Sequence, residues 1–231
     1  MSKRPIAVDD LFNMKLVSDP QISSDGKTIA FVQTRLDLEE NKYRSHLWLV
    51  RADGTAPARQ FTFGEGKDRA PRWSPDGKWI AFISNREEDK DRLYLIALAG
   101  GEARRLTDGD SKPSAAVWSP DGSMIAYTAL VFTDATKRAN GAREESDVRS
   151  YTRLNYKSNS DGFWDYGWRQ IFSLSLRREG RGEGRQLTRG NYIHTQPAWS
   201  PDGKTMVFVA NRTARADERN ITDLWCVPAQ G

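Results

Sequence analysis

The stretch that decides the fold is PRWSPDGKWIAFI, residues 71–83. Ser-Pro-Asp-Gly is typical of a type I turn, because proline presets φ at the second position, aspartate tolerates the third and glycine closes the turn. A short segment that ends in Trp73 precedes the turn, and an apolar, β-rich run begins at Trp79. The stretch therefore predicts a β-hairpin whose second strand is apolar on both faces and packs between neighbouring sheets.

This pattern occurs four times in the chain. The other copies are PQISSDGKTIAFV at residues 20–32, AVWSPDGSMIAYT at residues 116–128 and PAWSPDGKTMVFV at residues 197–209. The first serines of consecutive copies lie 51, 45 and 81 residues apart. A period in the forties is typical of β-propeller blades, and the long third interval indicates an insertion. Asp76, Asp121 and Asp202 recur once per repeat, so we interpret them as turn residues that do not converge on one site.

Each repeat continues in the same way after the hairpin. A third β-rich run follows, then a turn with glycine or small residues, and then a short run that ends in Phe-Thr or Leu-Thr. Strand, tight turn, strand, loop, strand, tight turn, strand describes one four-stranded blade. We therefore predict an all-β fold: a partial β-propeller of three complete blades and most of a fourth, preceded by a short helix. The expected boundaries are a helical segment at 1–19 and a propeller at 20–231, with blades at about 20–63, 70–107, 114–188 (insert 131–168) and 196–231.

The bulk composition excludes several function classes. The 231 residues include 35 basic and 31 acidic ones, which give a net charge of +4, a mild basic excess that is not typical of nucleic-acid binding. No stretch approaches the roughly 20 apolar residues that a membrane span needs. A single cysteine, Cys226, and an N-terminus without a signal-peptide pattern favour a reducing, cytoplasmic location. No zinc motif is present, and we predict neither a metal nor a cofactor.

The fourth repeat reaches Gly231 where a turn into a fourth strand is expected. Propellers hide their sheet edges by ring closure, and an incomplete blade leaves backbone donors and acceptors unpaired. We therefore expect this chain to be part of a longer polypeptide, and to be poorly soluble or self-associating when it is expressed alone.

The repeats and the segments around them resemble the N-terminal propeller of the prolyl oligopeptidase family of serine peptidases, closest to its acylaminoacyl-peptidase branch. The resemblance rests on the WSPDGK repeats, on residues 8–23 and on residues 149–157 followed by 161–164. It implies a catalytic α/β-hydrolase domain with a Ser-Asp-His triad, which the propeller covers so that only short or flexible peptides enter. This chain has no G-x-S-x-G motif, so no catalytic residue is assigned in it.

The implied partners are the rest of the propeller, the hydrolase domain and short peptide substrates, with self-association left open. The implied parent enzyme hydrolyses short or N-blocked peptides. A TolB-like propeller that serves as a protein-interaction platform, without a hydrolase domain, is the alternative function.

The candidate binding residues lie in the insert at 131–168 and at its end. Arginine offers a planar fork for carboxylates, and aromatic rings offer apolar walls. If the insert faces the hydrolase domain, these side chains bind the polar end of a peptide; the alternative is that they only solvate a face or form interdomain ion pairs. The candidates are Arg149, Arg153, Tyr156, Lys157, Trp164 and Arg169. For His46 and His194, which have no adjacent group to activate, the sequence favours structural roles.

Overall fold

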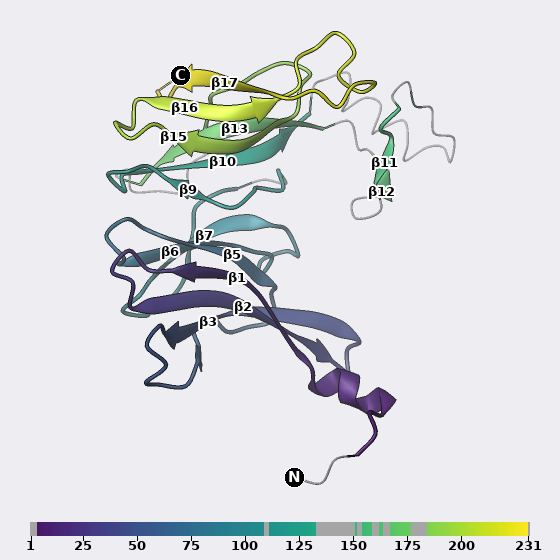
Figure 1. The fold of residues 1–231 in the computed structure, drawn as a ribbon, viewed down its shortest axis with the longest axis vertical. Coiled ribbons are helices and arrows are strands. Elements are labelled where there is room, and N and C mark those ends of the chain that lie inside the picture. Colours follow the sequence, from purple (N-terminus) through teal and green to yellow (C-terminus); the bar gives the residue numbers. More distant parts are fainter. Residues whose placement is uncertain are drawn as a thin grey trace. The chain divides into compact units, whose positions relative to one another are not determined.

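The structure is a computed structural model, and it describes residues 4–108, 111–132, 151, 154–158, 162–163, 167–176 and 184–230. It divides into two compact units, the first of which takes in the chain up to residue 110. Each unit contains two antiparallel blade sheets (Figure 1), and the second unit also contains a small two-stranded sheet. Three of the blade sheets have four strands, and the fourth has three within the described residues. A 3-10 helix at Val8–Asn13 precedes the first sheet. The predicted partial propeller with a short N-terminal helix is confirmed.

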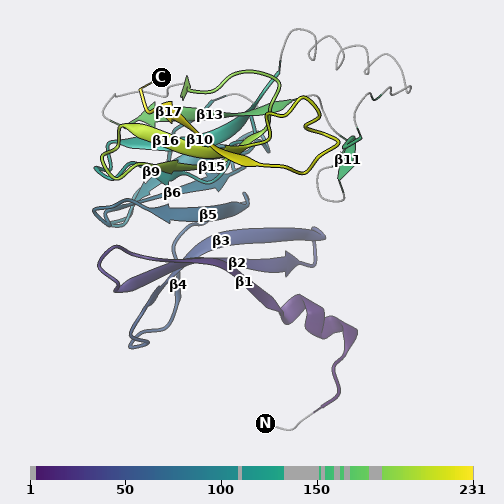
Figure 2. The same ribbon diagram turned by 45° about the horizontal axis from the view of Figure 1, so that its top comes forward.

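The first unit holds the first two blades. In Figure 2 the strands β1, β2 and β3 of the first blade lie side by side, with β4 beyond them. The first sheet consists of β1 (Lys15–Ile22), β2 (Thr28–Asp37), β3 (Lys42–Arg51) and β4 (Arg59–Gln60). The second consists of β5 (Asp68–Trp73), β6 (Trp79–Ser84), β7 (Arg92–Ala97) and β8 (Arg104–Arg105). The first sheet begins at Lys15, which pairs with Arg35 near the end of β2. The first strand therefore starts before the expected boundary at residue 20.

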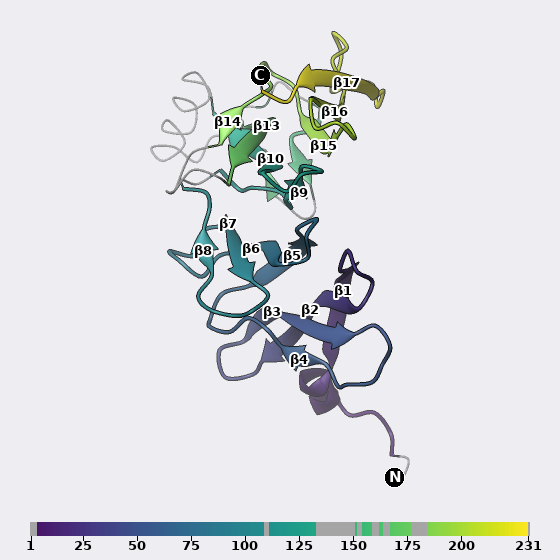
Figure 3. The same ribbon diagram turned by 90° about the vertical axis from the view of Figure 1, so that its left-hand side faces the viewer.

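The second unit holds the other two blades. Figure 3 shows β14, β13, β10 and β9 in this order across the third sheet. That sheet consists of β9 (Val117–Trp118), β10 (Met124–Val131), β13 (Trp168–Ser175) and β14 (Arg185–Gln186). The fourth sheet consists of β15 (His194–Trp199), β16 (Thr205–Ala210) and β17 (Asp223–Pro228). The chain between β10 and β13 contains a small hairpin of β11 (Lys157–Ser158) and β12 (Gly162–Phe163).

The Ser-Pro-Asp-Gly boxes, with Ser-Ser-Asp-Gly in the first blade, close the hairpin between the first two strands of each blade. In the second blade, the Gly77 N–H donates to the Ser74 carbonyl at 2.9 Å, and Gly77 has a φ of +68°, which favours glycine. The Ser74 hydroxyl donates to Asp76 at 2.6 Å and accepts from the Trp79 N–H at 3.0 Å. The hydrogen bond from Ser74 is the main reason that the pKa of Asp76 lies below its ordinary value. The same serine–aspartate contact recurs in the other three blades, at Ser23–Asp25, Ser119–Asp121 and Ser200–Asp202.

The tryptophan before the box joins each even-numbered blade to the preceding one in its unit. Trp73 Nε1 donates to the Gln21 carbonyl at 2.9 Å, and Trp199 Nε1 donates to the Val117 carbonyl at 2.9 Å. Since a buried indole N–H needs an acceptor, this bond fixes the orientation of the ring between two sheets. The tryptophan of the motif is therefore a contact between blades.

The threonine that ends each fourth strand also has a repeated role. The hydroxyl of Thr62 accepts from the Leu47 N–H at 2.9 Å, and Thr107 accepts from Leu93 at 3.0 Å in the second blade. Thr188 repeats the contact in the third blade. The side chain thus satisfies a buried backbone donor of the third strand, where the short fourth strand has ended.

The first strand of three blades contains a β-bulge in front of a proline. Asp19, Ala70 and Gln196 each precede a proline and have positive φ values of 47°, 54° and 52°. The register between the first and second strands shifts at each of these points. Bulges change the direction of the side chains that follow them. In the first unit Arg72 follows one bulge and donates to Asp19, the residue at the other, at 2.8 Å.

Each unit has its own apolar core between its two sheets. The first core joins Ala30, Val32, Leu47, Leu49 and Phe61 to Ile80, Phe82, Tyr94 and Ile96 of the second blade. The second core joins Ala126, Ile171 and Leu187 to Met206, Phe208 and Ala210 of the fourth blade. The apolar runs after the boxes and the third strands together supply most of these side chains, so burial of their facing sides stabilises each pair of sheets.

Candidate functional site

A buried polar cluster lies between the first two blades, beside the start of β5. Asp68 is 1% exposed, and its carboxylate accepts from Arg86 Nη2 at 2.9 and 3.1 Å. His46 Nδ1 lies 3.8 Å from Asp68 Oδ2, beyond hydrogen-bond distance. Burial alone would raise the pKa of Asp68, but three polar neighbours and the charge on Arg86 outweigh it, so the pKa lies below its ordinary value. These neighbours are His46, Ser84 and Thr62.

His194 begins β15 and occupies the corresponding place between the third and fourth blades. It is fully buried, with Nδ1 3.2 Å from the Arg169 carbonyl and Nε2 2.9 Å from Arg212 Nη2. The pKa of His194 is lowered to about 4, mainly by burial; the charge of Arg212 acts in the same direction, and the Arg169 carbonyl opposes both effects. The ring is therefore neutral at pH 7, with Nδ1 as donor and Nε2 as acceptor. With both nitrogens bonded, His194 has a structural role and offers no free base.

An arginine stacked on aromatic rings is common to both polar clusters, and sequence reasoning missed it. The Arg86 guanidinium lies 5.2 Å from the Phe82 ring centre and 5.1 Å from that of Tyr94. Arg212 lies 5.5 Å from Phe208, and the Trp225 ring is its nearest, at 4.5 Å. The signal was present in the sequence, because an Asn-Arg pair follows the second strand at the same distance from the box serine in both blades.

The described part of the insert contacts the loop between β16 and β17. The Leu154 N–H donates to an Asp217 carboxylate oxygen at 3.4 Å, and the Asn155 amide donates to the Asp217 carbonyl at 3.4 Å. The exposed ring of Tyr156 lies 5.3 Å from that of Tyr151. Lys157 is exposed and pairs with Phe163 in the β11–β12 hairpin. Of the predicted binding residues, Tyr156 and Lys157 are thus both exposed at the surface.

The other four predicted binding residues have different outcomes. Arg149, Arg153 and Trp164 lie outside the described residues. Arg169 lies in β13, where its Nη1 atom donates to the Lys112 carbonyl and to the Thr128 hydroxyl, both at 3.2 Å. These contacts bind Arg169 to its own blade, and its carbonyl faces His194.

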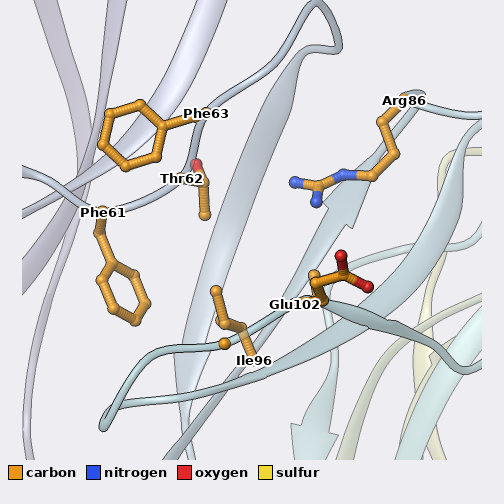
Figure 4. Close-up of a pocket in the computed structure, with 8 residues that line it drawn as sticks. Phe61, Thr62, Phe63, Arg86, Ile96 and Glu102 are labelled. Atoms are coloured by element: carbon orange, nitrogen blue, oxygen red, sulfur yellow. The ribbon is translucent and has the colours of Figure 1, made fainter.

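A cavity of about 390 Å³ lies in the first unit, between the end of the first sheet and the face of the second. Figure 4 shows Phe61, Thr62 and Phe63 on one side of it, with Arg86, Ile96 and Glu102 on the other. It combines apolar walls with two ionic side chains, the combination that is typical of small-molecule sites.

The described ranges contain no group of three or more His, Cys, Asp or Glu side chains that could hold a metal ion. In the same part of the chain, no helix has the length and apolar character needed to cross a membrane.

Comparison with known proteins agrees with this architecture. The TolB beta propeller domain family (PD40) matches residues 11–154. The chain belongs to this family. This chain is 36% identical over 96% of its length to a protein of Bacillus subtilis (strain 168) named "Uncharacterized peptidase YuxL". A 69-residue part of it is 41% identical to dipeptidyl-peptidase 5 of Porphyromonas gingivalis.

Solved structures show the same fold. An acylaminoacyl peptidase in complex with Z-Gly-Gly-Phe-chloromethyl ketone matches 94% of this propeller with a TM-score of 0.70 and 19% identity. TolB from Acinetobacter baumannii matches 93% with a TM-score of 0.56 and 20% identity. The predicted resemblance to propeller-bearing peptidases of the acylaminoacyl-peptidase type is thereby confirmed. The chain spans 34% of the length of the Bacillus relative and 32% of that of the solved acylaminoacyl peptidase.

Proposed function

We propose that this chain is the propeller portion of a cytoplasmic serine peptidase that hydrolyses short or N-blocked peptides. The observation that carries the proposal is the 36% identity to a peptidase, maintained over 96% of the chain. The nucleophile lies in an α/β-hydrolase domain outside these 231 residues, and the propeller limits access to it. The chain itself supplies no catalytic residue.

The insert supplies the propeller's contacts to the substrate in this proposal. Tyr156 offers an exposed aromatic ring and Lys157, the next residue in the chain, offers an ammonium group; both lie on the connection between the second and third strands of the third blade. A cation beside an aromatic surface suits the carboxylate end of a peptide. Arg149, Arg153 and Trp164 belong to the same proposed set, while Arg169 acts as a positioning residue through its contacts with its own sheet.

Hydrolysis by the full-length protein tests the proposal. We expect it to cleave N-acetyl-alanyl or dipeptidyl p-nitroanilides, and to lose this activity after treatment with a fluorophosphonate, which modifies activated serines. The ratio of kcat/KM between the blocked and free substrates gives the specificity. A protein that cleaves neither substrate class and is not modified would instead fit an interaction platform of the TolB kind.

A further inference from the structure

The cavity between the first two blades has an apolar wall and an exposed aromatic ring at its rim. Phe61 and Ile96 belong to the core of the first unit, so this wall is rigid. Phe63 is 69% exposed, although it lies beside the cavity. An apolar ligand group that slid between Phe61 and Phe63 would cover surface that water now contacts, which favours binding.

Arg86 provides a fixed hydrogen-bond donor for this cavity. Its Nε atom donates to Ser84 at 3.1 Å, and its Nη2 atom donates to Asp68. Two aromatic rings fix the plane of the guanidinium. The remaining Nη1 atom has no partner among the described residues, and Figure 4 shows the group pointing into the cavity. A donor held in place in advance loses little freedom when a ligand binds.

Glu102 provides an acceptor for the same cavity. It lies in the turn before β8, and its side chain is exposed. Within the described residues, its carboxylate makes no ion pair or hydrogen bond, with Arg86 or with any other group. One cavity thus presents an open guanidinium N–H and an open carboxylate that are not paired with each other.

We propose that this cavity binds a free dipeptide as a zwitterion. The peptide carboxylate accepts from Arg86 Nη1, the α-ammonium group pairs with Glu102, and an apolar side chain lies between Phe61 and Phe63. The volume of about 390 Å³ is near the lower end of the roughly 300–1,000 Å³ found for small-molecule sites, which suits a ligand of this size. The inference rests on the proposed function in one respect only, because the peptidase activity would supply such dipeptides as products.

Calorimetric titration of the full-length protein with Ala-Phe tests the cavity, after fluorophosphonate treatment has closed any active-site serine. We expect saturable binding that weakens about tenfold when the dipeptide is N-acetylated or C-amidated, since each change removes one charge-assisted contact. Glu102→Gln should weaken binding of Ala-Phe about tenfold. The matched control, Glu65→Gln, changes the same charge in the exposed loop next to Phe63 and should leave the Kd within twofold.

Coupling between ligand and variant gives the sharpest result. N-acetylation should cost affinity in the wild type but none in the Glu102→Gln protein, because the partner of the ammonium group is already gone. Equal losses in both proteins, or no binding of Ala-Phe to the wild type, would overturn the proposed site. Binding in a protein that the fluorophosphonate does not modify would keep the site and refute the peptidase, so the two proposals fail separately.

Discussion

Arg86 and Asp68 form the polar centre of the junction between the first two blades: one guanidinium nitrogen lies 2.9 and 3.1 Å from the two carboxylate oxygens. The pair follows from the fold, because Asp68 begins β5 and Arg86 follows β6, the strand that pairs with it. The side chain of Asp68 is almost fully buried, and that of Arg86 is 25% exposed. The pair therefore closes the junction and also places Arg86 at the proposed dipeptide cavity.

Replacement of Arg86 by alanine should destabilise the first unit. Loss of the guanidinium leaves the Asp68 carboxylate buried without its main counter-charge, which costs about 3 kcal/mol in comparable buried pairs. We expect the midpoint of urea unfolding of the full-length protein, measured by tryptophan fluorescence, to be clearly lower than that of the wild type. Arg104→Ala, at an exposed position of β8, is the control and should unfold like the wild type. Equal midpoints for both variants would show that the pair contributes nothing.

The buried ring of His194 should make stability depend on pH. Its pKa is lowered to about 4 in the folded protein, whereas an unfolded histidine titrates near 6.5. The unfolded state binds the proton first, so the contribution is complete above pH 6.5 and is lost as the pH falls towards 4, by about 3 kcal/mol in total. Urea unfolding at several pH values between about 4 and 6.5 measures this loss of stability. In His194→Gln the loss should disappear, and an unchanged pH profile would contradict the assignment.

Trp73→Phe should cost about 1 kcal/mol of stability, because it removes the hydrogen bond to the Gln21 carbonyl and keeps most of the apolar ring. Trp79→Phe is the matched control, since that indole is 40% exposed and its N–H makes no described hydrogen bond. Thermal unfolding of both variants gives the comparison. A larger loss of thermal stability in Trp79→Phe than in Trp73→Phe would contradict a stabilising contact of Trp73 between the blades.

Lys157→Ala in the full-length protein should lower kcat/KM for short peptides about fivefold if the insert contacts the substrate. An exposed ion pair to a small ligand is worth about 1 kcal/mol at most. Lys204→Ala removes the same charge at an exposed position directly after the Ser-Pro-Asp-Gly box of the fourth blade, outside the insert, and should leave kcat/KM unchanged. Equal effects of the two variants would exclude a specific role for Lys157.

The sequence was sufficient to predict the features that local chemistry determines. The turn at Ser74–Gly77, the apolar run after it and the threonine that ends the fourth strand all follow from residues near one another in the chain. The same repeats predicted the number of blades, which the structure confirms.

Features that depend on packing between strands could not be predicted in this way. The positive φ of Ala70 in front of Pro71 is against the usual preference of L-residues, and only the pairing of β5 with β6 makes it necessary. The partners of His194 come from β13 and from the loop after β16, so no local pattern indicates that its ring is neutral and doubly bonded. The dipeptide cavity combines residues of two blades for the same reason.

Mass-spectrometric mapping of a fluorophosphonate on the full-length protein tests the central claim most directly. A single modified serine should be found outside residues 1–231, and peptides from the propeller should carry no label. A modified serine within residues 1–231, or no modification anywhere in an intact and folded protein, would contradict the account of this chain as the non-catalytic propeller of a serine peptidase.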